Sequence, residues 1–159
     1  MLDGTTIVAA IPAAGFTHLV WLPDSHLGMW EPALVGSSLP VVRPCREGEA
    51  VGIAAGLMLG GARPLVAMQC TGFFEAGDAV RNVVHDLRLP LKLIVGVRSW
   101  RAAQAGKTDD NCPCFAERLV AAWDLPTVWF YPSTDAAGFP DVLGRLVNLP
   151  GPGAILWAE

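Results

Sequence analysis

Six short, continuous apolar runs constrain the fold of this 159-residue chain more than any other feature. They lie at 18–22, 40–42, 65–68, 91–97, 127–130 and 154–157. Apolar residues follow one another in these runs and do not alternate with polar ones, which is typical of strands covered on both faces. The longer stretches between them predict helices at 4–14, 27–36, 47–60, 75–88, 114–123 and 134–147. Strands that alternate with helices predict an α/β fold, with a doubly wound, six-stranded parallel sheet and helices on both faces.

Composition narrows the classes of function. The chain is 52% hydrophobic and only 16% charged, which predicts that part of its apolar surface lies in an interface with another chain. The net charge of −4 and the scattered basic residues argue against nucleic-acid binding. The start of the chain lacks a basic signal-peptide region, and the longest apolar run, 51–62, is too short to span a bilayer. A cytoplasmic protein without a membrane anchor is expected.

The cysteines do not predict a metal site. Cys45, Cys70, Cys112 and Cys114 include no C-x-x-C pair, and the histidines are far from them in sequence. Reduced thiols are the expectation for a cytosolic fold. A chain of this length, without a linker or an internal repeat, is expected to form one domain over 1–159.

In open parallel sheets, ligands bind beyond the carboxyl ends of the strands. This rule selects the loops at 23–26, 45–47, 69–75, 98–111 and 131–134 as candidate binding segments. Of these, 98–111 is long enough to act as a lid.

Glu47 is the first candidate residue, because it opens a helix whose following residues are small and aliphatic. A carboxylate at the mouth of an apolar helix is costly to bury unless it has a partner or a function. The alternative is structural, since Glu47 and Glu49 would both interact favourably with the dipole of the helix as acidic residues in its first turn.

The sequence around Glu47 has a recognisable order. A strand at 39–43 leads into Glu47, the helix continues to Gly56, and Gly60 and Gly61 break the chain before the next strand. This order resembles the pyrimidine-binding (PYR) domain of thiamine diphosphate enzymes. In that family a glutamate opens the helix after the second strand, and the spacing to Gly56 matches Glu47 rather than Glu49. The resemblance implies that Glu47 hydrogen-bonds N1′ of the cofactor's aminopyrimidine ring and so favours the imino tautomer that activates the cofactor.

A second match follows the strand at 65–68. Gln69, Thr71 and Gly72 resemble a Gln-Asn-Ser-Gly-like segment of sulfopyruvate and phosphonopyruvate decarboxylases, with Cys70 in place of the Asn. The resemblance implies that these three residues face the cofactor, whereas 73–75 (Phe-Phe-Glu) departs from the family pattern. The alternative is that this small-residue turn is an ordinary turn that caps the next helix.

Substrate-binding candidates lie after two other strands. Asp24, Ser25 and His26 stand where related decarboxylases hold polar residues over the substrate. The alternative is that Asp24 or Ser25 caps a helix and His26 is exposed. Arg98 stands where the sulfopyruvate family has a Ser-His-Arg-Gly-like segment, and its guanidinium would bind a carboxylate, sulfonate or phosphonate.

No Gly-Asp-Gly segment with a downstream Asn, which holds the diphosphate and Mg²⁺ in this superfamily, occurs in the chain. The resemblance therefore implies an α subunit that needs a separately encoded diphosphate-binding β subunit, in an α2β2 or larger heteromer, with Mg²⁺ bound mainly by the partner. The implied reaction is non-oxidative decarboxylation of a small 2-oxo acid such as sulfopyruvate or phosphonopyruvate. Two alternatives remain: a carboligase or oxidative decarboxylase subunit that uses thiamine diphosphate, and a non-catalytic α/β binding or regulatory module.

Overall fold

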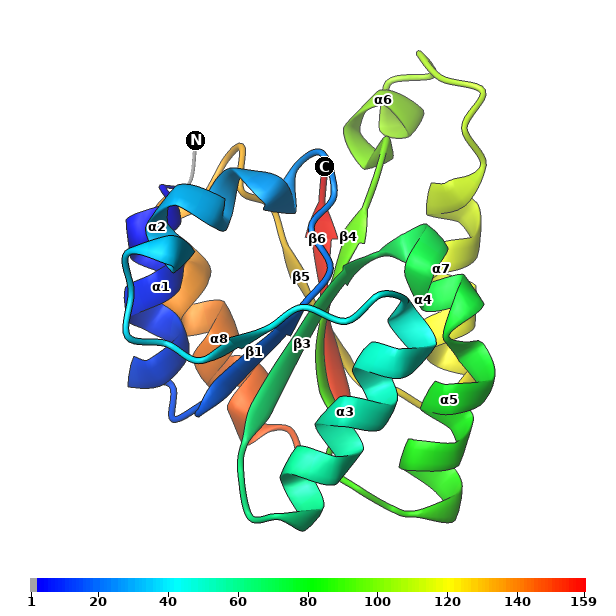
Figure 1. Cartoon of the computed structure of the whole chain (residues 1–159). Coiled ribbons are helices and arrows are strands. Elements are labelled where there is room, and N and C mark those ends of the chain that lie inside the picture. Colours follow the sequence, from blue (N-terminus) through cyan, green and yellow to red (C-terminus); the bar gives the residue numbers. More distant parts are fainter. Residues whose placement is uncertain (1–2) are drawn as a thin grey trace.

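The computed structural model describes residues 3–159 and has a six-stranded parallel sheet at its centre (Figure 1). The strands are β1 (His18–Trp21), β2 (Val41–Val42), β3 (Pro64–Gln69), β4 (Lys92–Val97), β5 (Thr127–Phe130) and β6 (Gly153–Ala158). Their order across the sheet is β2-β1-β3-β4-β6-β5, and every neighbouring pair is parallel. The predicted fold class and all six strands are therefore confirmed. Met1 and Leu2, at the start considered for a signal peptide, lie outside the described residues.

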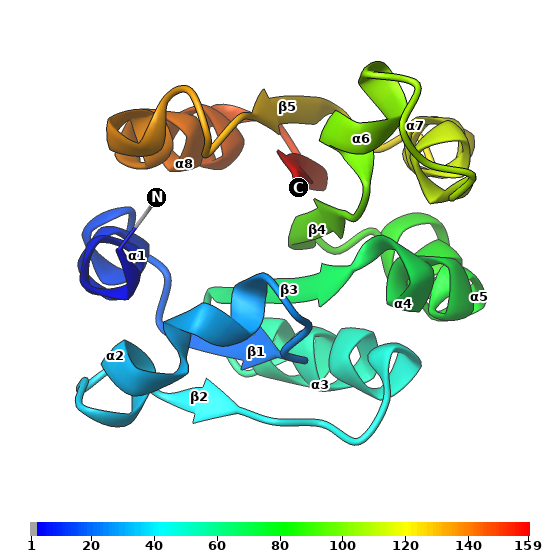
Figure 2. The same cartoon turned by 90° about the horizontal axis from the view of Figure 1, so that it is seen from above.

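Helices cover both faces of the sheet, as the view from above shows (Figure 2). On one face lie α1 (Gly4–Ala13), the 3-10 turn η1 (Leu27–Trp30), α2 (Glu31–Val35) and α8 (Phe139–Asn148), which the 3-10 turn η3 (Ala136–Gly138) precedes. On the other lie α3 (Glu47–Leu59), α4 (Cys70–Glu75), α5 (Gly77–Arg81) with its π-helical continuation η2 (Asn82–Asp86), and α7 (Cys112–Ala122). Two apolar cores result, one on each face. Because β4 and β6 are buried along their whole length, they have continuous apolar sequences.

The largest departure from the sequence-based prediction follows β3. The helix expected over 75–88 begins at Cys70 instead, directly after Gln69, so the predicted turn at 69–72 is the first turn of α4. Cys70 and Phe73 are fully buried, and their burial holds this segment in the helix although its small residues are typical of a turn. A second departure is α6 (Trp100–Gln104), a short helix within the segment that was expected to be a loop.

Two helical elements have a defined residue at one end. Gly60 is the C-cap of α3, and the side chain of Asp135 accepts a hydrogen bond from the Gly138 N–H at the start of η3. At the other end of the sheet from the candidate loops, Lys92 is buried and its Nζ donates to the carbonyl oxygens of Leu146 and Leu149 at the end of α8, at 3.0 and 2.8 Å. Lys92 therefore satisfies carbonyl groups at the end of this helix, where intrahelical donors run out.

Within residues 3–159 no helix has both the length and the apolar character required to cross a membrane. The same residues contain no group of three or more His, Cys, Asp or Glu side chains placed to hold a metal ion.

Candidate functional site

The carboxyl ends of all six strands meet at one edge of the molecule, because the sheet is entirely parallel (Figure 1). The five candidate segments therefore gather there, as the sequence predicted. They are the loops after β1 and β5, the segment before α3, the start of α4 and the segment that contains α6. Two groups of polar residues lie along this edge. One is built around Glu47 and the other around Glu159.

Glu47 is the first residue of α3, and its half-buried side chain lies directly against Gly72 in the first turn of α4. A Cβ added at Gly72 would overlap the Glu47 carboxyl group. Only glycine therefore leaves room for this carboxyl in its observed position. The structure brings together two residues that the family resemblance had selected separately.

Other acidic residues perform the structural tasks at the start of α3. The Gly48 N–H donates to Glu75 Oε2 at 3.0 Å, and the guanidinium of Arg46 forms an ion pair with Glu75. The Cys45 N–H donates to Glu49 Oε2 at 2.7 Å. The Arg46 hydrogen bond, and then that of Gly48, lower the pKa of Glu75 below its usual value. Glu75 thus accepts from one free N–H group in the first turn of α3, and within residues 3–159 the Glu47 carboxyl accepts none of the hydrogen bonds at this helix start.

Glu75 belongs to the segment 73–75, which departs from the family pattern. The structure gives it a defined place, since it ties the end of α4 to the start of α3 and so fixes the helix that carries Glu47. Gln69 and Thr71 flank the same region, and the Thr71 hydroxyl donates to Gln69 Oε1 at 2.9 Å. The four residues expected to face the cofactor, Glu47, Gln69, Thr71 and Gly72, are therefore neighbours at the carboxyl edge.

Asp24 has two different environments for its two carboxyl oxygens. Its Oδ1 accepts hydrogen bonds from the N–H groups of His26 and Leu27, both at 2.7 Å, which is the turn-capping role that the sequence left open. Its Oδ2 is buried and has no hydrogen-bond partner in the described part of the chain. Ser25 and His26 are both exposed, and His26 lines a pocket.

Glu159 was missed by the sequence analysis. It follows β6 at the carboxyl edge, its residue is only 8% exposed, and neither carboxyl oxygen has a hydrogen-bond partner within residues 3–159. Gly96 in the neighbouring β4 makes room for it, because a Cβ there would overlap Glu159 Oε1 and would lie 3.2 Å from Asp24 Oδ2. A carboxylic acid directly after a fully apolar strand is a signal that could have identified this residue.

Burial raises the pKa of Glu159 to about 8, and the negative charge of Asp24 acts in the same direction, while Arg98 opposes the shift. Removing a carboxylate from water disfavours its charged form, and a second carboxylate nearby adds repulsion. Glu159 therefore holds a proton at neutral pH. A carboxylic acid with this property at a concave site is a candidate functional group.

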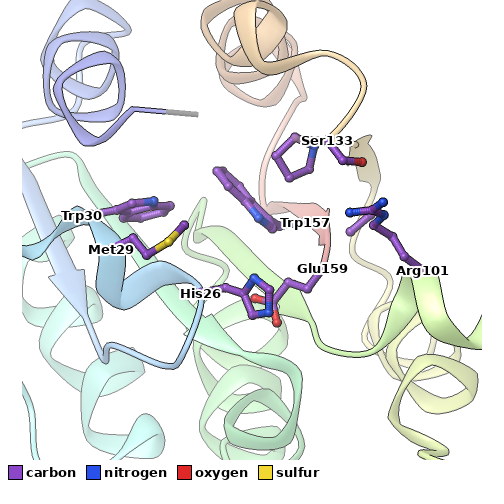
Figure 3. Close-up of a pocket in the computed structure, with 9 residues that line it drawn as sticks. His26, Met29, Trp30, Arg101, Ser133, Trp157 and Glu159 are labelled. Atoms are coloured by element: carbon purple, nitrogen blue, oxygen red, sulfur yellow. The ribbon is translucent and has the colours of Figure 1, made fainter. Parts of the chain in front are cut away.

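Glu159 lines a pocket of about 360 Å³ between η1, the end of β6 and the loop after β5 (Figure 3). Trp30 and Trp157 form an apolar wall, with their ring centroids 5.4 Å apart in an edge-to-face arrangement. Arg101 and Ser133 line the opposite side. The N–H of Arg101 donates to the backbone oxygen of Glu159 at 2.9 Å, which fixes the start of α6 beside the end of β6.

Arg98, the substrate-binding candidate, is paired within its own segment. Its Nε donates to Asp110 Oδ2 at 2.8 Å, and the Ser99 hydroxyl donates to the same oxygen. The Cys112 N–H donates to Asp110 Oδ1, and these bonds, led by the one from Arg98, hold the pKa of Asp110 well below its usual range. Ser99 has a φ of 59°, in the left-handed region. The segment expected to be a lid is therefore tied to β4 and α7 through Asp110.

Comparison with known proteins gives a consistent picture of the fold. A curated sulfopyruvate decarboxylase of Methanosarcina acetivorans is 32% identical over 68 residues, which is 43% of this chain and 17% of that protein. The benzoylformate decarboxylase of Polynucleobacter necessarius has a similar structure, with a TM-score of 0.76 and 17% identity over 100% of this chain. A thiamine diphosphate-dependent 4-hydroxybenzoylformate decarboxylase of Rhodococcus jostii gives a TM-score of 0.70 and 19% identity over 99% of the chain. No protein-family model matches.

The similarity covers one part of larger proteins, because the chain corresponds to 30% of the length of each of these two solved structures and to 17% of the curated relative. A putative thiamine diphosphate-dependent enzyme of Mycobacterium smegmatis has the same relation, with a TM-score of 0.70 and 13% identity. At these identities the structural likeness establishes the fold. The chain therefore has the fold of one part of these larger thiamine diphosphate-dependent enzymes, and over 68 residues its sequence is similar to a sulfopyruvate decarboxylase.

Proposed function

We propose that the chain is the α subunit of a thiamine diphosphate-dependent, non-oxidative 2-oxo acid decarboxylase in the cytoplasm. The observation that carries this proposal is the position of Glu47, whose carboxyl group lies on Gly72 at the carboxyl edge of the sheet. Glu75 accepts from the Gly48 N–H and Glu49 from the Cys45 N–H at the same helix start, whereas Glu47 accepts no hydrogen bond within residues 3–159, so its carboxyl remains available for a ligand. The names of the similar proteins supply the class of reaction.

The residues present fit one half of the cofactor. Glu47 would share a proton with a ring nitrogen of the aminopyrimidine, while Gln69 and Thr71 would border the ring and Gly72 would keep the space beside Glu47 open. Thiamine diphosphate, when bound, supplies the carbon nucleophile and the electron sink for decarboxylation. The role of this chain is to orient the ring and to hold the proton at the Glu47 carboxyl.

The other half of the cofactor requires a partner. The sequence contains no Gly-Asp-Gly segment for the diphosphate and its Mg²⁺. We therefore assign these to a separately encoded β subunit, in an α2β2 or larger assembly. The high apolar fraction of the chain supports an assembly of this kind.

For the substrate we propose a small 2-oxo acid with a second anionic group, such as sulfopyruvate or phosphonopyruvate. The name of the Methanosarcina relative supports this class. Asp24, Ser25 and His26 would border the substrate, and Arg98 would bind an anionic group with the terminal nitrogens of its guanidinium. The Nε of Arg98 is already used by Asp110, which orients the guanidinium for that contact.

The test is proton exchange at C2 of thiamine diphosphate in the complex of the chain with its co-purified partner, followed by NMR in D2O. Glu47→Gln is expected to abolish the catalysed exchange without loss of the complex. Glu49→Gln is the matched control and is expected to retain exchange, because an amide oxygen can still accept from the Cys45 N–H. Full exchange in the Glu47→Gln complex would refute the proposed role.

The same complex decides between the proposed function and its alternatives. Incubation with a panel of 2-oxo acids is expected to release CO2 and the matching aldehyde from a sulfonated or phosphonated acid. Condensation products without free aldehyde would instead indicate a carboligase. A wild-type complex that binds no thiamine diphosphate would show that the chain is a binding module.

A further inference from the structure

Two carboxyl groups meet above Gly96 at the carboxyl edge of the sheet. Glu159 follows β6 and Asp24 follows β1, although β3 and β4 stand between these two strands. A Cβ at Gly96 would overlap Glu159 Oε1 and would lie 3.2 Å from Asp24 Oδ2. The loop after β1 therefore reaches across the end of β3 and brings its carboxyl group to that of Glu159.

Neither carboxyl group is satisfied where the two meet. Asp24 Oδ2 and both oxygens of Glu159 are buried and have no hydrogen-bond partner within residues 3–159. Buried polar groups are nearly always hydrogen-bonded in native proteins, and two buried carboxylates close together also repel each other. One proton held between the two groups removes both costs, because a protonated carboxyl donates to the carboxylate beside it.

The other oxygen of Asp24 organises the loop after β1. Asp24 Oδ1 accepts hydrogen bonds from the N–H groups of His26 and Leu27, both at 2.7 Å. Leu27 is the first residue of η1 and is fully buried, so these bonds fix the turn that contains Ser25 and His26. The carboxyl group of Asp24 therefore joins this turn on one side to Glu159 on the other.

We propose that Glu159 is a positioning residue, which shares one proton with Asp24 Oδ2 above Gly96 and thereby holds the loop at 23–27 against the end of β6. Loss of that proton leaves two carboxylates beside each other, and their repulsion releases the loop. The shared proton is a property of this chain alone. The clause that Ser25 and His26 in this loop border a 2-oxo acid rests on the proposed function.

The surroundings of Glu159 set the pH at which the proton is lost. Burial raises the pKa of Glu159 to about 8, the charge of Asp24 acts in the same direction, and Arg98 opposes the shift. The loop is therefore expected to be held at neutral pH and released as the pH rises through about 8. The charged or titratable side chains around Glu159 are Asp24 and His26 in the loop after β1, Arg98 and Arg101 after β4, and Cys70 at the start of α4. Cys70 stays a neutral thiol over this range, because burial raises its pKa to about 12.

The first experiment is an NMR titration of the full chain, labelled with ¹³C and ¹⁵N, from pH 6 to pH 9.5. The carboxyl carbon signals of Asp24 and Glu159 report the two acids, and the amide signal of Leu27 reports the loop. Groups that share a proton titrate as a pair, so all three signals are expected to shift with one midpoint near pH 8. The inference is overturned if Glu159 shows no transition above pH 6, or if the signals of Asp24 and Leu27 stay fixed while Glu159 titrates.

Two variants separate the shared proton from packing. Glu159→Gln keeps a neutral donor of the same size that does not titrate, so the Leu27 signal is expected to keep its neutral-pH position up to pH 9.5. Glu117→Gln, at an exposed residue of α7, is the matched control and is expected to show the wild-type transition. A transition near pH 8 that persists at Leu27 in Glu159→Gln would show that another group moves the loop, and Glu159 would lose its proposed role.

The second experiment measures kcat and KM in the complex of the chain with its co-purified partner. One pH unit above its pKa, about a tenth of an acid keeps its proton. The KM of the wild-type complex for the 2-oxo acid is therefore expected to rise by up to about tenfold relative to that of Glu159→Gln, with little change in kcat. A wild-type KM that follows the KM of Glu159→Gln at every pH would contradict the positioning role. A complex without decarboxylase activity would refute the proposed function alone, because the NMR titration tests the shared proton in the chain by itself.

Discussion

Glu159→Gln is expected to stabilise the protein, and increasingly so as the pH rises. In the folded protein burial raises the pKa of Glu159 from 4.5 to about 8. Between pH 4.5 and about pH 8, the native state therefore keeps a proton on Glu159 that the unfolded chain releases. Stability falls with rising pH wherever the native state binds more protons than the unfolded state, so Glu159 costs the wild-type protein stability between these two pKa values.

The size of the effect follows from the shift in pKa. Each unit of pKa shift corresponds to about 1.4 kcal/mol, and the full shift of Glu159 corresponds to about 5 kcal/mol. A glutamine cannot ionise and avoids this cost. The difference in free energy of unfolding between Glu159→Gln and wild type should therefore grow by about 2.5 kcal/mol from pH 5 to pH 7, and by about 4 kcal/mol in total by pH 9.

Urea unfolding followed by circular dichroism at several pH values measures this difference directly. Glu117→Gln is the matched control, because Glu117 is exposed and its hydrogen bond from Trp129 Nε1 can be accepted equally well by a glutamine oxygen. The change that it causes is the baseline against which Glu159→Gln is compared at each pH. Asp24→Asn is expected to reduce the pH dependence of the wild-type protein, because Asp24 contributes to the raised pKa of Glu159.

The test is how the difference in free energy of unfolding between Glu159→Gln and wild type changes with pH. A difference that is the same at every pH could arise from altered packing of Gln alone. A difference between Glu159→Gln and wild type that stays flat from pH 5 to pH 9 would refute the raised pKa. A difference that changes only below about pH 5 would show that folding shifts the pKa of Glu159 little from its ordinary value.

Three further predictions test the packing at other positions. Gly72→Ala should lower the free energy of unfolding of the wild-type protein by about 1–3 kcal/mol, because the new Cβ overlaps the Glu47 carboxyl group. The same substitution should be neutral or stabilising when Glu47→Ala is also present, and a double-mutant cycle of urea unfolding measures this. Lys92→Met should lower the free energy of unfolding by about 1–3 kcal/mol, because it removes the hydrogen bonds to two carbonyl groups at the end of α8. An unchanged free energy of unfolding would mean that water replaces these hydrogen bonds. In the native state iodoacetamide should modify the exposed Cys45 rapidly and leave Cys70 intact, since burial raises the pKa of Cys70 to about 12; mass spectrometry of the labelled peptides decides this.

Local patterns determined the fold class and the location of the site. Continuous apolar runs between helical stretches predict a parallel sheet wherever they occur, because strands buried on both faces need apolar residues at every position. The same topology places all carboxyl ends at one edge, so the loops that gather there followed from the sequence. The position of Glu47 at the start of α3 is equally local, and the structure confirms it.

The start of α4 shows where local patterns fail. Gln69 to Gly72 has the composition of a turn, and its small residues have weak helix propensity. The burial of Cys70 and Phe73 against the sheet outweighs that propensity and extends the helix to the end of β3. Tertiary packing, which the local sequence does not contain, decided this boundary.

The sequence by itself determined the alternation of elements, the parallel sheet, the edge that carries the polar loops and the choice of Glu47 as the leading candidate. Only the tertiary structure decided that Glu47 lies on Gly72, that Glu75 holds the start of its helix, and that Glu159 is buried beside Asp24 above Gly96. The physical reason is that a contact or a pKa depends on which distant segments meet. Residues far apart in the chain acquire these properties only when the sheet brings their strand ends together.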